Sequence, residues 1–390
     1  MSTNKIFIAA AGSGKTKFIV DDVLNNQPNK VLITTFTNAN EQSIRERLAV
    51  ANGGSLPSGV IIQPWFSFLL EHGVRPYRFW DKKDNGLNLV SEKSGYRFTN
   101  GDGQKIYWGE KDFSNYYFDS SMRVYSDKIS KLVFECNKNS KGYVVGRLEK
   151  IFNYIFIDEV QDMAGWDFEI IKLLMQSSIT VIMVGDQRQA VYKTNPAPKY
   201  KKYANGKIAD FITNECKNIT CEIDTSTLKT SYRNSQEICE LSLKLYPHLP
   251  SCCSGLKCTS THMGIYLVRK EDVENYANCI DDADYEFNFE RKSRGIKFVQ
   301  LRNNKTTKDV MSDREVLNFG ISKGLEFYHI LIYPTKPMLN WLEDNNFGLK
   351  EGARADFYVA LTRAFFSVGI VVPDDFNVNI DNIKTWSAIK

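Results

Sequence analysis

The sequence predicts an α/β fold that is built on parallel sheets and divided between more than one domain. Short apolar runs alternate with amphipathic segments of helical spacing, which is typical of parallel strands covered by helices on both faces. A length of 390 residues exceeds what one hydrophobic core organises, so two or three domains are expected. With 43% hydrophobic and 25% charged residues, the composition is that of a globular protein and excludes a disordered chain.

The alternation is regular at both ends of the first half of the chain. An apolar run at 6–10 predicts a buried strand, and a Gly-rich turn follows it. Arginines near the end of the segment 38–48 suit the negative C-terminal end of a helix dipole. The elements expected here are a strand at 6–10, a helix at 16–24, a strand at 31–36, a helix at 38–48, a strand at 154–157, a helix at 168–175 and a strand at 180–184.

The middle of this region has a different character. Residues 66–149 are rich in Tyr, Phe, Trp, Lys and Asp and interrupt the alternation of strands and helices. We interpret them as an accessory subdomain inserted into a first domain that comprises residues 1–65 and 150–225. Residues 226–390 repeat the α/β pattern and form the second domain. Its clearest strands are expected near 265–268, 330–333 and 368–371.

A phosphate loop follows the first strand; it starts at Ala9 or Gly12, and its Gly-rich part reads Gly12-Ser13-Gly14-Lys15-Thr16. Backbone N–H groups freed by the glycines, together with the N-terminus of the next helix, suit the phosphates of a nucleotide. Lys15 is expected to bind the terminal phosphates, and the Thr16 hydroxyl to bind Mg²⁺. A chance Gly-rich turn is the alternative, but the strand before the loop and the helix after it argue against that.

A second polar motif ends the expected strand at 154–157. Asp158 and Glu159 are adjacent carboxylates at the carboxyl end of that strand, where α/β sheets place their ligands. Asp158 is expected to hold Mg²⁺, while Glu159 would orient and deprotonate an attacking water. The alternative is a solvated acidic turn, which the phosphate loop upstream disfavours. The sequence therefore predicts ATP and Mg²⁺ as ligands.

At this point the sequence resembles the UvrD/Rep-like superfamily-1 DNA helicases, which are ATP hydrolases. Six short boxes occur in that family's order, and the resemblance extends from residue 6 to about residue 371. They are TFTN at 35–38, DEVQD at 158–162, GDQRQAVY at 185–192, SYRN at 231–234, KGLEF at 323–327 and YVALTRA at 358–364. The resemblance implies a P-loop NTPase with two RecA-like parallel-sheet domains that hydrolyses ATP between them, with an insertion in the first.

The resemblance also implies roles for individual residues. Gln189 would couple the γ-phosphate to the nucleic-acid groove, and Tyr232 would stack on the adenine. Arg233 and Arg363 would reach the γ-phosphate, where guanidinium groups stabilise the departing phosphoryl. Glu326 would contact the sugar or phosphate side. The expected activity is movement along single-stranded DNA, 3′ to 5′, or unwinding of duplex DNA.

Some positions depart from the family. Thr194 occupies the place of a family aromatic, and roughly 90 residues between Arg233 and Lys323 leave no room for the family's second accessory domain. Only residues 1–8 precede the phosphate loop, so we expect the family's glutamine-containing, adenine-reading box to be missing. The hydrolytic residues are thus complete, while those for unwinding are reduced.

Aromatic and basic residues provide candidate nucleic-acid contacts. Phe36, Trp65, Phe66 and Tyr192 are candidates for stacking on unpaired bases, although core packing is an equal alternative for Trp65 and Phe66. A formal net charge of +4 permits a nucleic-acid partner without demanding one. The candidate phosphate contacts are Arg45, Lys199, Lys201 and Lys202.

A second class of function stays open beside the motor. The chain could be a nucleotide-dependent switch that docks on a partner nuclease or another operon-encoded protein and unwinds nothing by itself. Compact chains of this kind resemble the helicase subunits of Gabija-type bacterial antiviral systems, which connects both alternatives with antiviral defence. Stimulation of ATP hydrolysis by DNA distinguishes a motor from a switch.

Apolar runs, the N-terminal residues and the cysteines together predict the cellular compartment of the protein. No apolar run approaches the roughly 20 residues that span a bilayer, and no cleavable leader precedes the phosphate loop, so a soluble, cytoplasmic protein is expected. Eight irregularly spaced cysteines are then reduced thiols. A cluster of soft ligands lacks any C-x-x-C pair, so we expect ordinary residues rather than a zinc site. Its members are His248, Cys252, Cys253, Cys258 and His262.

Overall fold

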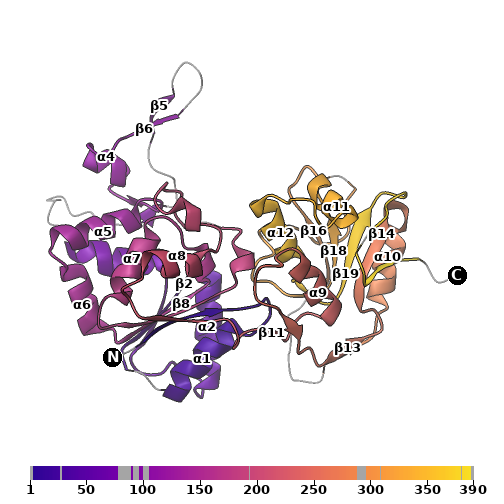
Figure 1. Cartoon of the computed structure of the whole chain (residues 1–390), viewed down its shortest axis with the longest axis horizontal. Helices are drawn as coiled ribbons and strands as arrows, with labels where there is room; N and C mark the ends of the chain where they lie inside the picture. The colour runs from indigo at the N-terminus through magenta and orange to yellow at the C-terminus, as the bar shows by residue number, and fades with distance from the viewer. Residues whose placement is uncertain are drawn as a thin grey trace. The chain divides into compact units, whose positions relative to one another are not determined.

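The computed structural model shows two compact units (Figure 1). Unit 1 comprises Met1–Phe7, Lys15–Gln187 and Tyr192–Asp224, and unit 2 comprises Ile8–Gly14, Arg188–Val191 and Thr225–Lys390. Within the residues that the structure describes, no helix is long and apolar enough to cross a membrane. The described residues are 3–26, 29–77, 89–90, 96–99, 105–192, 194–287, 296–307, 309–378 and 380–387.

Unit 1 is organised around a six-stranded sheet of order β10-β1-β9-β8-β2-β3. Strand β8 pairs in parallel with β2 and β9, β2 pairs in parallel with β3, and β1 in parallel with β10. The strands β2, β8 and β9 are rich in β-branched and other apolar residues that are buried, as expected for the interior of a sheet covered on both faces. Their bounds are β1 (Asn4–Ile8), β2 (Val31–Thr35), β3 (Val60–Pro64), β8 (Tyr154–Asp158), β9 (Thr180–Gly185) and β10 (Cys221–Asp224).

Helices lie on both sides of this sheet, with α1 and α2 together on one side and α7 and α8 on the other in Figure 1. Helix α1 buries Ile19, Val20 and Val23, which recur at helical spacing. Thr37 caps α2, because its hydroxyl accepts a hydrogen bond from the Asn40 N–H at 3.1 Å. The helices are α1 (Lys15–Asn26), α2 (Asn38–Ala51), α7 (Asp167–Met175) and α8 (Ile208–Glu215).

The segment predicted as an insertion lies within unit 1, and part of it falls outside the described residues. Two parts of the segment pack closely. Helix α5 (Ile129–Asn139) contacts both the π-helix η1 (Leu69–Val74) and α7. Gly73 permits this approach, since a Cβ there would lie 2.5 Å from Val133 Cγ2. Its other elements are α3 (Trp65–Phe68), η2 (Arg75–Tyr77), β4 (Leu89–Val90), β5 (Tyr96–Thr99), β6 (Lys105–Tyr107), α4 (Phe113–Tyr117), β7 (Val124–Tyr125) and α6 (Tyr143–Ile151).

Unit 2 contains a second six-stranded sheet, of order β17-β16-β18-β19-β14-β20, in which every neighbouring pair is parallel. Apolar residues pack on both of its faces: one cluster includes Ile265, Leu267 and Ile330, and another includes Val268 and Leu331. The alternation of neighbouring residues between the two clusters follows the twofold period of a strand. The strands are β14 (Gly264–Arg269), β16 (Ile296–Arg302), β17 (Val316–Asn318), β18 (Phe327–Tyr333), β19 (Ala364–Val372) and β20 (Ile383–Thr385).

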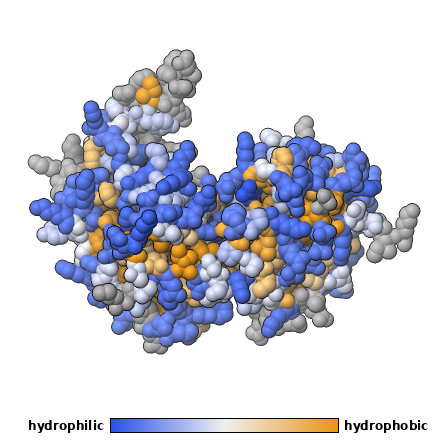
Figure 2. Space-filling view, viewed as in Figure 1, coloured by the Kyte–Doolittle hydropathy of each residue, from blue (hydrophilic) through white to orange (hydrophobic). Residues whose placement is uncertain are grey.

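The two parallel sheets with flanking helices confirm the predicted fold class of two RecA-like α/β domains. Hydrophilic side chains cover most of the surface visible in Figure 2, while the apolar residues fill the cores. The helices of unit 2 are α9 (Gln236–Lys244), α10 (Val273–Asp281), α11 (Lys336–Glu343) and α12 (Glu351–Leu361), and its short strands are β11 (Thr230–Ser231), β12 (Cys253–Ser254), β13 (Cys258–Ser260) and β15 (Tyr285–Phe287).

The first strand differs from the prediction. It spans Asn4–Ile8, whereas the sequence predicts a strand at 6–10, and Ala9 and Ala10 are buried in the loop that follows. In a sequence, small apolar residues after a strand look like its continuation. Here the Ala10 N–H instead donates to the carbonyl of Leu228, outside the sheet, at 2.8 Å. The loop therefore begins earlier than its glycines indicate.

Candidate active site and nucleic-acid interface

The candidate hydrolytic residues of unit 1 gather where its strands end. Strand β8 ends at Asp158, which is 2% exposed, and Glu159 follows it. The Lys15 ammonium lies 3.7 Å from the Glu159 carboxylate, with both side chains largely buried. The fold thus brings the lysine of the phosphate loop and the second carboxylate of the acidic box together, although the two motifs lie far apart in the sequence.

Glu159 has an unusual backbone for a residue with a side chain. Its φ of 55° and ψ of 39° lie in the left-handed region, which costs about 1–3 kcal/mol and recurs at functional sites. The Glu159 N–H donates to Asp158 Oδ1 at 3.0 Å, and the Asp162 N–H donates to the Glu159 carbonyl at 3.0 Å. These bonds hold the two carboxylates on a tight turn directly after the strand.

Gln161 is a site residue to which the sequence alone assigns no role. It is 1% exposed, its Nε2 donates to Glu159 Oε2, and its Oε1 accepts from the Asp186 N–H at 3.1 Å. Gly185 permits this arrangement, since a Cβ there would lie 2.5 Å from Gln161 Oε1. The side chain joins the acidic box to the end of β9. The sequence could have indicated a role for Gln161, because this residue lies between two carboxylates of the same box.

The first half of the phosphate loop is held by unit 2. The Tyr232 N–H donates to the Gly12 carbonyl at 2.9 Å, and a Cβ at Gly12 would lie 2.6 Å from Arg233 Cβ and 2.7 Å from Ser231 Oγ. Gly12 also has a φ of 70°, so both its conformation and its surroundings require glycine. The buried Ser13 hydroxyl has no hydrogen-bond partner among the described residues, which fits a loop that receives phosphate oxygens.

Four of the predicted residues form one hydrogen-bonded network within unit 2. Arg363 is 1% exposed and donates from Nη2 to Gln189 Oε1 at 3.2 Å. Arg233 forms an ion pair with Glu326 at 2.5 Å. Both arginines also bond Thr362, Arg233 to its carbonyl at 3.3 Å and Arg363 to its hydroxyl at 3.3 Å. The structure therefore brings Gln189, Arg233, Glu326 and Arg363 together.

Two further residues of unit 2 bear on nucleotide binding. Lys323, the first residue of the KGLEF box, donates to the Gln189 carbonyl at 2.9 Å. Tyr232 is 54% exposed, and its ring packs beside Gly255, where a Cβ would lie 3.0 Å away. An exposed ring on a segment fixed to the phosphate loop is suited to stacking on a base.

Three half-buried aromatic rings cluster in unit 1. The Phe36 ring centroid lies 6.0 Å from that of Phe66 and 6.0 Å from that of Tyr192. Trp65 does not join them, because it is 0% exposed and its indole N–H donates to Asp167 at 2.8 Å. The prediction that Trp65 stacks on bases is therefore wrong for this structure, and Phe66, the next residue, lies in the cluster instead.

The candidate phosphate contacts are mostly engaged in ion pairs. Arg45 pairs with Glu41 at 2.6 Å, Lys199 with Glu169 at 2.8 Å, and Lys202 with Glu215 at 3.1 Å. Lys202 is the most exposed of the three cations, and exposed ion pairs are worth about 0–1 kcal/mol, so a phosphate can displace its carboxylate. Lys201 is exposed on the same segment as Lys199 and Lys202.

The donors around the phosphate loop fit a magnesium ion better than the cysteines fit zinc. Thr16 and Asp158 offer hydroxyl and carboxylate oxygens, the ligands that Mg²⁺ prefers when substrate phosphates complete its shell. Among the described residues, no group of three or more His, Cys, Asp or Glu side chains is placed to hold a metal. In the predicted soft-ligand cluster, His248 is exposed and the His262 ring stacks on Tyr266 at 4.4 Å; the Cys258 side chain lies outside the described residues.

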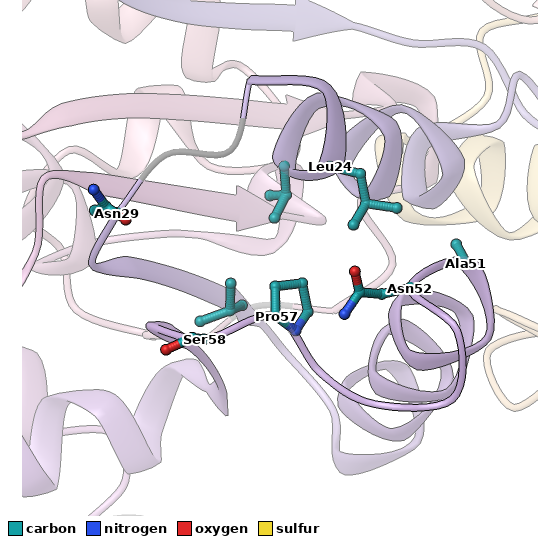
Figure 3. A pocket seen from close by; sticks show the side chains of 8 residues that line it. Leu24, Asn29, Ala51, Asn52, Pro57 and Ser58 are labelled. Carbon is teal, nitrogen blue, oxygen red and sulfur yellow. The ribbon is translucent and has the colours of Figure 1, made fainter.

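A pocket of about 520 Å³ opens elsewhere in unit 1 (Figure 3). It is lined by residues from the ends of α1 and α2 and from the turn before β3, including Leu24, Asn52 and Pro57. The side chains that line it carry no charge. It lies where β2 and β3 begin, while Asp158 and Gly185 lie where their strands end. The pocket is therefore separate from the candidate active site.

Comparisons with known proteins agree with this geometry. Residues 1–75 and 80–198 match the family model described as the UvrD/REP helicase N-terminal domain. The chain is 24% identical over 240 residues to the ATP-dependent DNA helicase Rep of Buchnera aphidicola subsp. Acyrthosiphon pisum (strain APS), which covers 48% of this chain and 36% of that protein. It is 22% identical over 282 residues to a probable DNA helicase II homolog of Mycoplasma capricolum, covering 60% and 38%.

The chain thus spans little more than a third of the length of these curated relatives. Among solved structures, the Arterivirus nonstructural protein 10 helicase aligns with 95% of this chain and 60% of its own, at 13% identity and a TM-score of 0.43.

Proposed function

Because the chain belongs to the UvrD/Rep-like family of superfamily-1 helicases, we propose that it hydrolyses ATP to move along single-stranded DNA, 3′ to 5′. The observation that carries the proposal is the approach of Lys15 to Glu159 at 3.7 Å. It joins a phosphate-binding lysine to a carboxylate that can accept a proton from water. Neither a solvated acidic turn nor a chance Gly-rich loop accounts for it.

Each residue of unit 1 has a distinct part in the proposed reaction. Lys15 would bind the terminal phosphates, and Thr16 and Asp158 would hold Mg²⁺, which would supply positive charge to the phosphate oxygens. Glu159 orients the attacking water and takes its proton. Gln161 donates to the Glu159 carboxylate and so restricts its rotation.

The residues of unit 2 act on the charge that develops during hydrolysis. We assign Arg233 and Arg363 to the γ-phosphate, Tyr232 to the adenine and Glu326 to the sugar or phosphate side. Both guanidinium groups are satisfied by protein acceptors here, Arg233 by Glu326 and Arg363 by Gln189. Exchanging those acceptors for phosphate oxygens would change the network that contains Gln189, the residue assigned to couple nucleotide and nucleic acid.

The proposed nucleic-acid contact is the ring cluster of Phe36, Phe66 and Tyr192. The three residues are only partly buried, and stacking of a ring on an unpaired base is worth roughly 1–3 kcal/mol. We assign the basic residues of the segment 199–202 to phosphate contacts, which should depend on salt.

ATP hydrolysis measured with and without a single-stranded oligonucleotide tests the proposal. We expect the rate to rise on adding DNA and the affinity for DNA to fall as salt is raised. A 5′-overhang and a 3′-overhang substrate then distinguish the direction of movement. A hydrolysis rate indifferent to DNA and RNA, without any salt-sensitive binding, would contradict a motor.

One observation favours a second candidate, a nucleotide-dependent switch that docks on a partner nuclease, including one in antiviral defence. Trp65 and Thr194 are both buried, so two positions considered for nucleic-acid contact do not provide one. A switch should bind ATP and hydrolyse it slowly, and its affinity for a partner should depend on the nucleotide. Purification from the native host with ATP or with ADP would separate this candidate from the motor.

A further inference from the structure

A buried carboxylate that the proposed reaction does not use lies beneath the candidate nucleic-acid interface. Asp167 begins α7 and is 0% exposed. Its Oδ1 accepts from the Trp65 indole N–H at 2.8 Å and from the Ser130 hydroxyl, and its Oδ2 accepts from the Thr194 hydroxyl. Burial raises the pKa of this carboxyl, while the three donors act in the opposite direction.

The three donors come from separate parts of unit 1. Trp65 directly precedes Phe66, and Thr194 follows Tyr192 by two residues, so two donors flank rings of the aromatic cluster. Ser130 belongs to α5 and carries no such neighbour. One buried carboxylate therefore ties together the two chain segments that supply Phe66 and Tyr192.

Thr194 also bonds the segment that carries the hydrolytic carboxylates. Its N–H donates to the Asp162 carbonyl at 3.0 Å, and its hydroxyl accepts from the Ala164 N–H at 3.1 Å. Asp162 closes the box that begins with Asp158, and its own N–H donates to the Glu159 carbonyl at 3.0 Å. A short chain of hydrogen bonds thus runs from the Tyr192 segment to the backbone of Glu159.

We propose that Asp167 and Thr194 are positioning residues that couple a base bound at Phe36, Phe66 and Tyr192 to the placement of Glu159. The inference rests on the proposed function, since it needs DNA to stimulate hydrolysis. At the position where the family has an aromatic, Thr194 presents a hydroxyl to the interior. It contributes to the DNA response through its hydrogen bonds and not by touching DNA.

The energetics favour movement of these segments as one body. A buried hydroxyl or N–H that loses its partner costs about 1–3 kcal/mol. Displacing Thr194 alone would remove one hydrogen bond from the Ala164 N–H and one from the Asp167 carboxylate, so the segments of Tyr192, Asp162 and Asp167 shift together or stay. Such a network transmits a displacement of Tyr192 without a larger rearrangement.

The chain offers a matched pair of variants. Thr194→Val and Ser130→Ala each remove one hydroxyl donor from the same buried carboxylate. Only Thr194 is also bonded to the segment of Asp162, and it follows Tyr192 by two residues in the sequence. Thr194→Ser restores the hydroxyl and serves as the conservative variant.

The measured quantity is the ratio of ATP hydrolysis with a saturating oligonucleotide to hydrolysis without it, beside the thermal midpoint of each variant. We expect both hydroxyl deletions to lower the midpoint, Thr194→Val by more, because its hydroxyl also accepts from the Ala164 N–H. The ratio should fall about five- to tenfold in Thr194→Val, a typical coupling, and stay within about twofold of wild type in Ser130→Ala and Thr194→Ser.

Two results would overturn the inference: equal ratios in Thr194→Val and Ser130→Ala, or a loss of the ratio in Thr194→Ser as large as in Thr194→Val. A wild-type ratio of one is a different failure, because it removes the proposed DNA response itself and the coupling with it. Titration of each variant with a fluorescent oligonucleotide completes the test. Coupling requires the stimulation to fall more than the affinity for DNA, whereas a direct DNA contact at Thr194 would lower both equally.

Discussion

Arg363 donates a hydrogen bond from Nη2 to Oε1 of Gln189 at 3.2 Å, which joins residues 174 positions apart in the sequence. The Lys323 ammonium donates to the carbonyl of the same glutamine at 2.9 Å. Side chain and backbone of Gln189 are therefore both held by residues of unit 2. Substituting either arginine of the network should therefore also affect the residues that are hydrogen-bonded to it.

Replacing Arg233 or Arg363 with Ala should lower kcat by at least about a hundredfold, because each removes a cation from the developing phosphoryl charge. The double variant should lose less than the product of the two, since both arginines bond Thr362. A double-mutant cycle at saturating ATP measures this. Arg354→Ala, in the helix α12 that precedes Arg363, is the control and should keep its turnover. Additive losses of less than about tenfold each would refute a shared site.

Replacing Glu159 with Gln should abolish hydrolysis and preserve nucleotide binding. The amide keeps the size of the side chain and removes the proton acceptor, so we expect kcat to fall by roughly 10²–10⁴. Lys15 and Asp158 remain to bind ATP and Mg²⁺. Equilibrium binding of a fluorescent ATP analogue checks the second point, and Glu46→Gln, an exposed residue of α2, serves as the control. Turnover near wild type would show that another group activates the water.

Removing the rings of Phe36 and Tyr192 should eliminate the DNA response. In Phe36→Ala and Tyr192→Ala the hydrolysis rate with oligonucleotide should fall to the rate of the same variant without it. Loss of one stacked ring weakens binding by roughly 1–3 kcal/mol, which a titration of oligonucleotide at fixed salt measures. Tyr143→Ala removes a ring that is 73% exposed on α6 and should change neither quantity.

Acid should destabilise the protein through His262. Burial, with a smaller contribution from Lys384, lowers the pKa of His262 to about 4. The unfolded chain therefore binds the proton first as pH falls, so the free energy of unfolding should drop between about pH 6.5 and pH 4. The loss due to this group is about 2 kcal/mol at pH 5. Denaturant titrations at several pH values should show a smaller drop in His262→Phe, but an unchanged one in His248→Asn, whose side chain is exposed.

The purified protein should contain no stoichiometric zinc or iron. His262 is stacked on Tyr266, and Cys252 lies 3.7 Å from the Cys239 sulfur, so these groups are engaged with protein neighbours. Elemental analysis after extensive dialysis measures the content. One metal per chain would contradict the expectation that the cluster consists of ordinary residues.

The phosphate loop, the acidic box and the parallel strands are predictable because short motifs and periodic apolar runs encode them locally. Local patterns do not predict which of Trp65 and Phe66 is buried. The two are adjacent aromatics at the start of α3, and which ring is buried depends on Asp167, which lies 102 residues away and accepts the indole N–H. In the sequence, Asp167 looks like an ordinary residue at a helix start. Its role depends on Ser130 and Thr194, which no local pattern connects with it.

The docking of Gly12 on Ser231 and Arg233 bears on how this chain can be divided or recombined. Residues 9–14 connect β1 to α1 in the sequence but, together with Ile8, belong to unit 2 by their contacts. A fragment ending at Asp224 would keep the whole loop and lose the Leu228 carbonyl and Tyr232 N–H that fix it. The two units are therefore not interchangeable modules, and grafting unit 1 onto a foreign partner should require the segment 228–233 to accompany it.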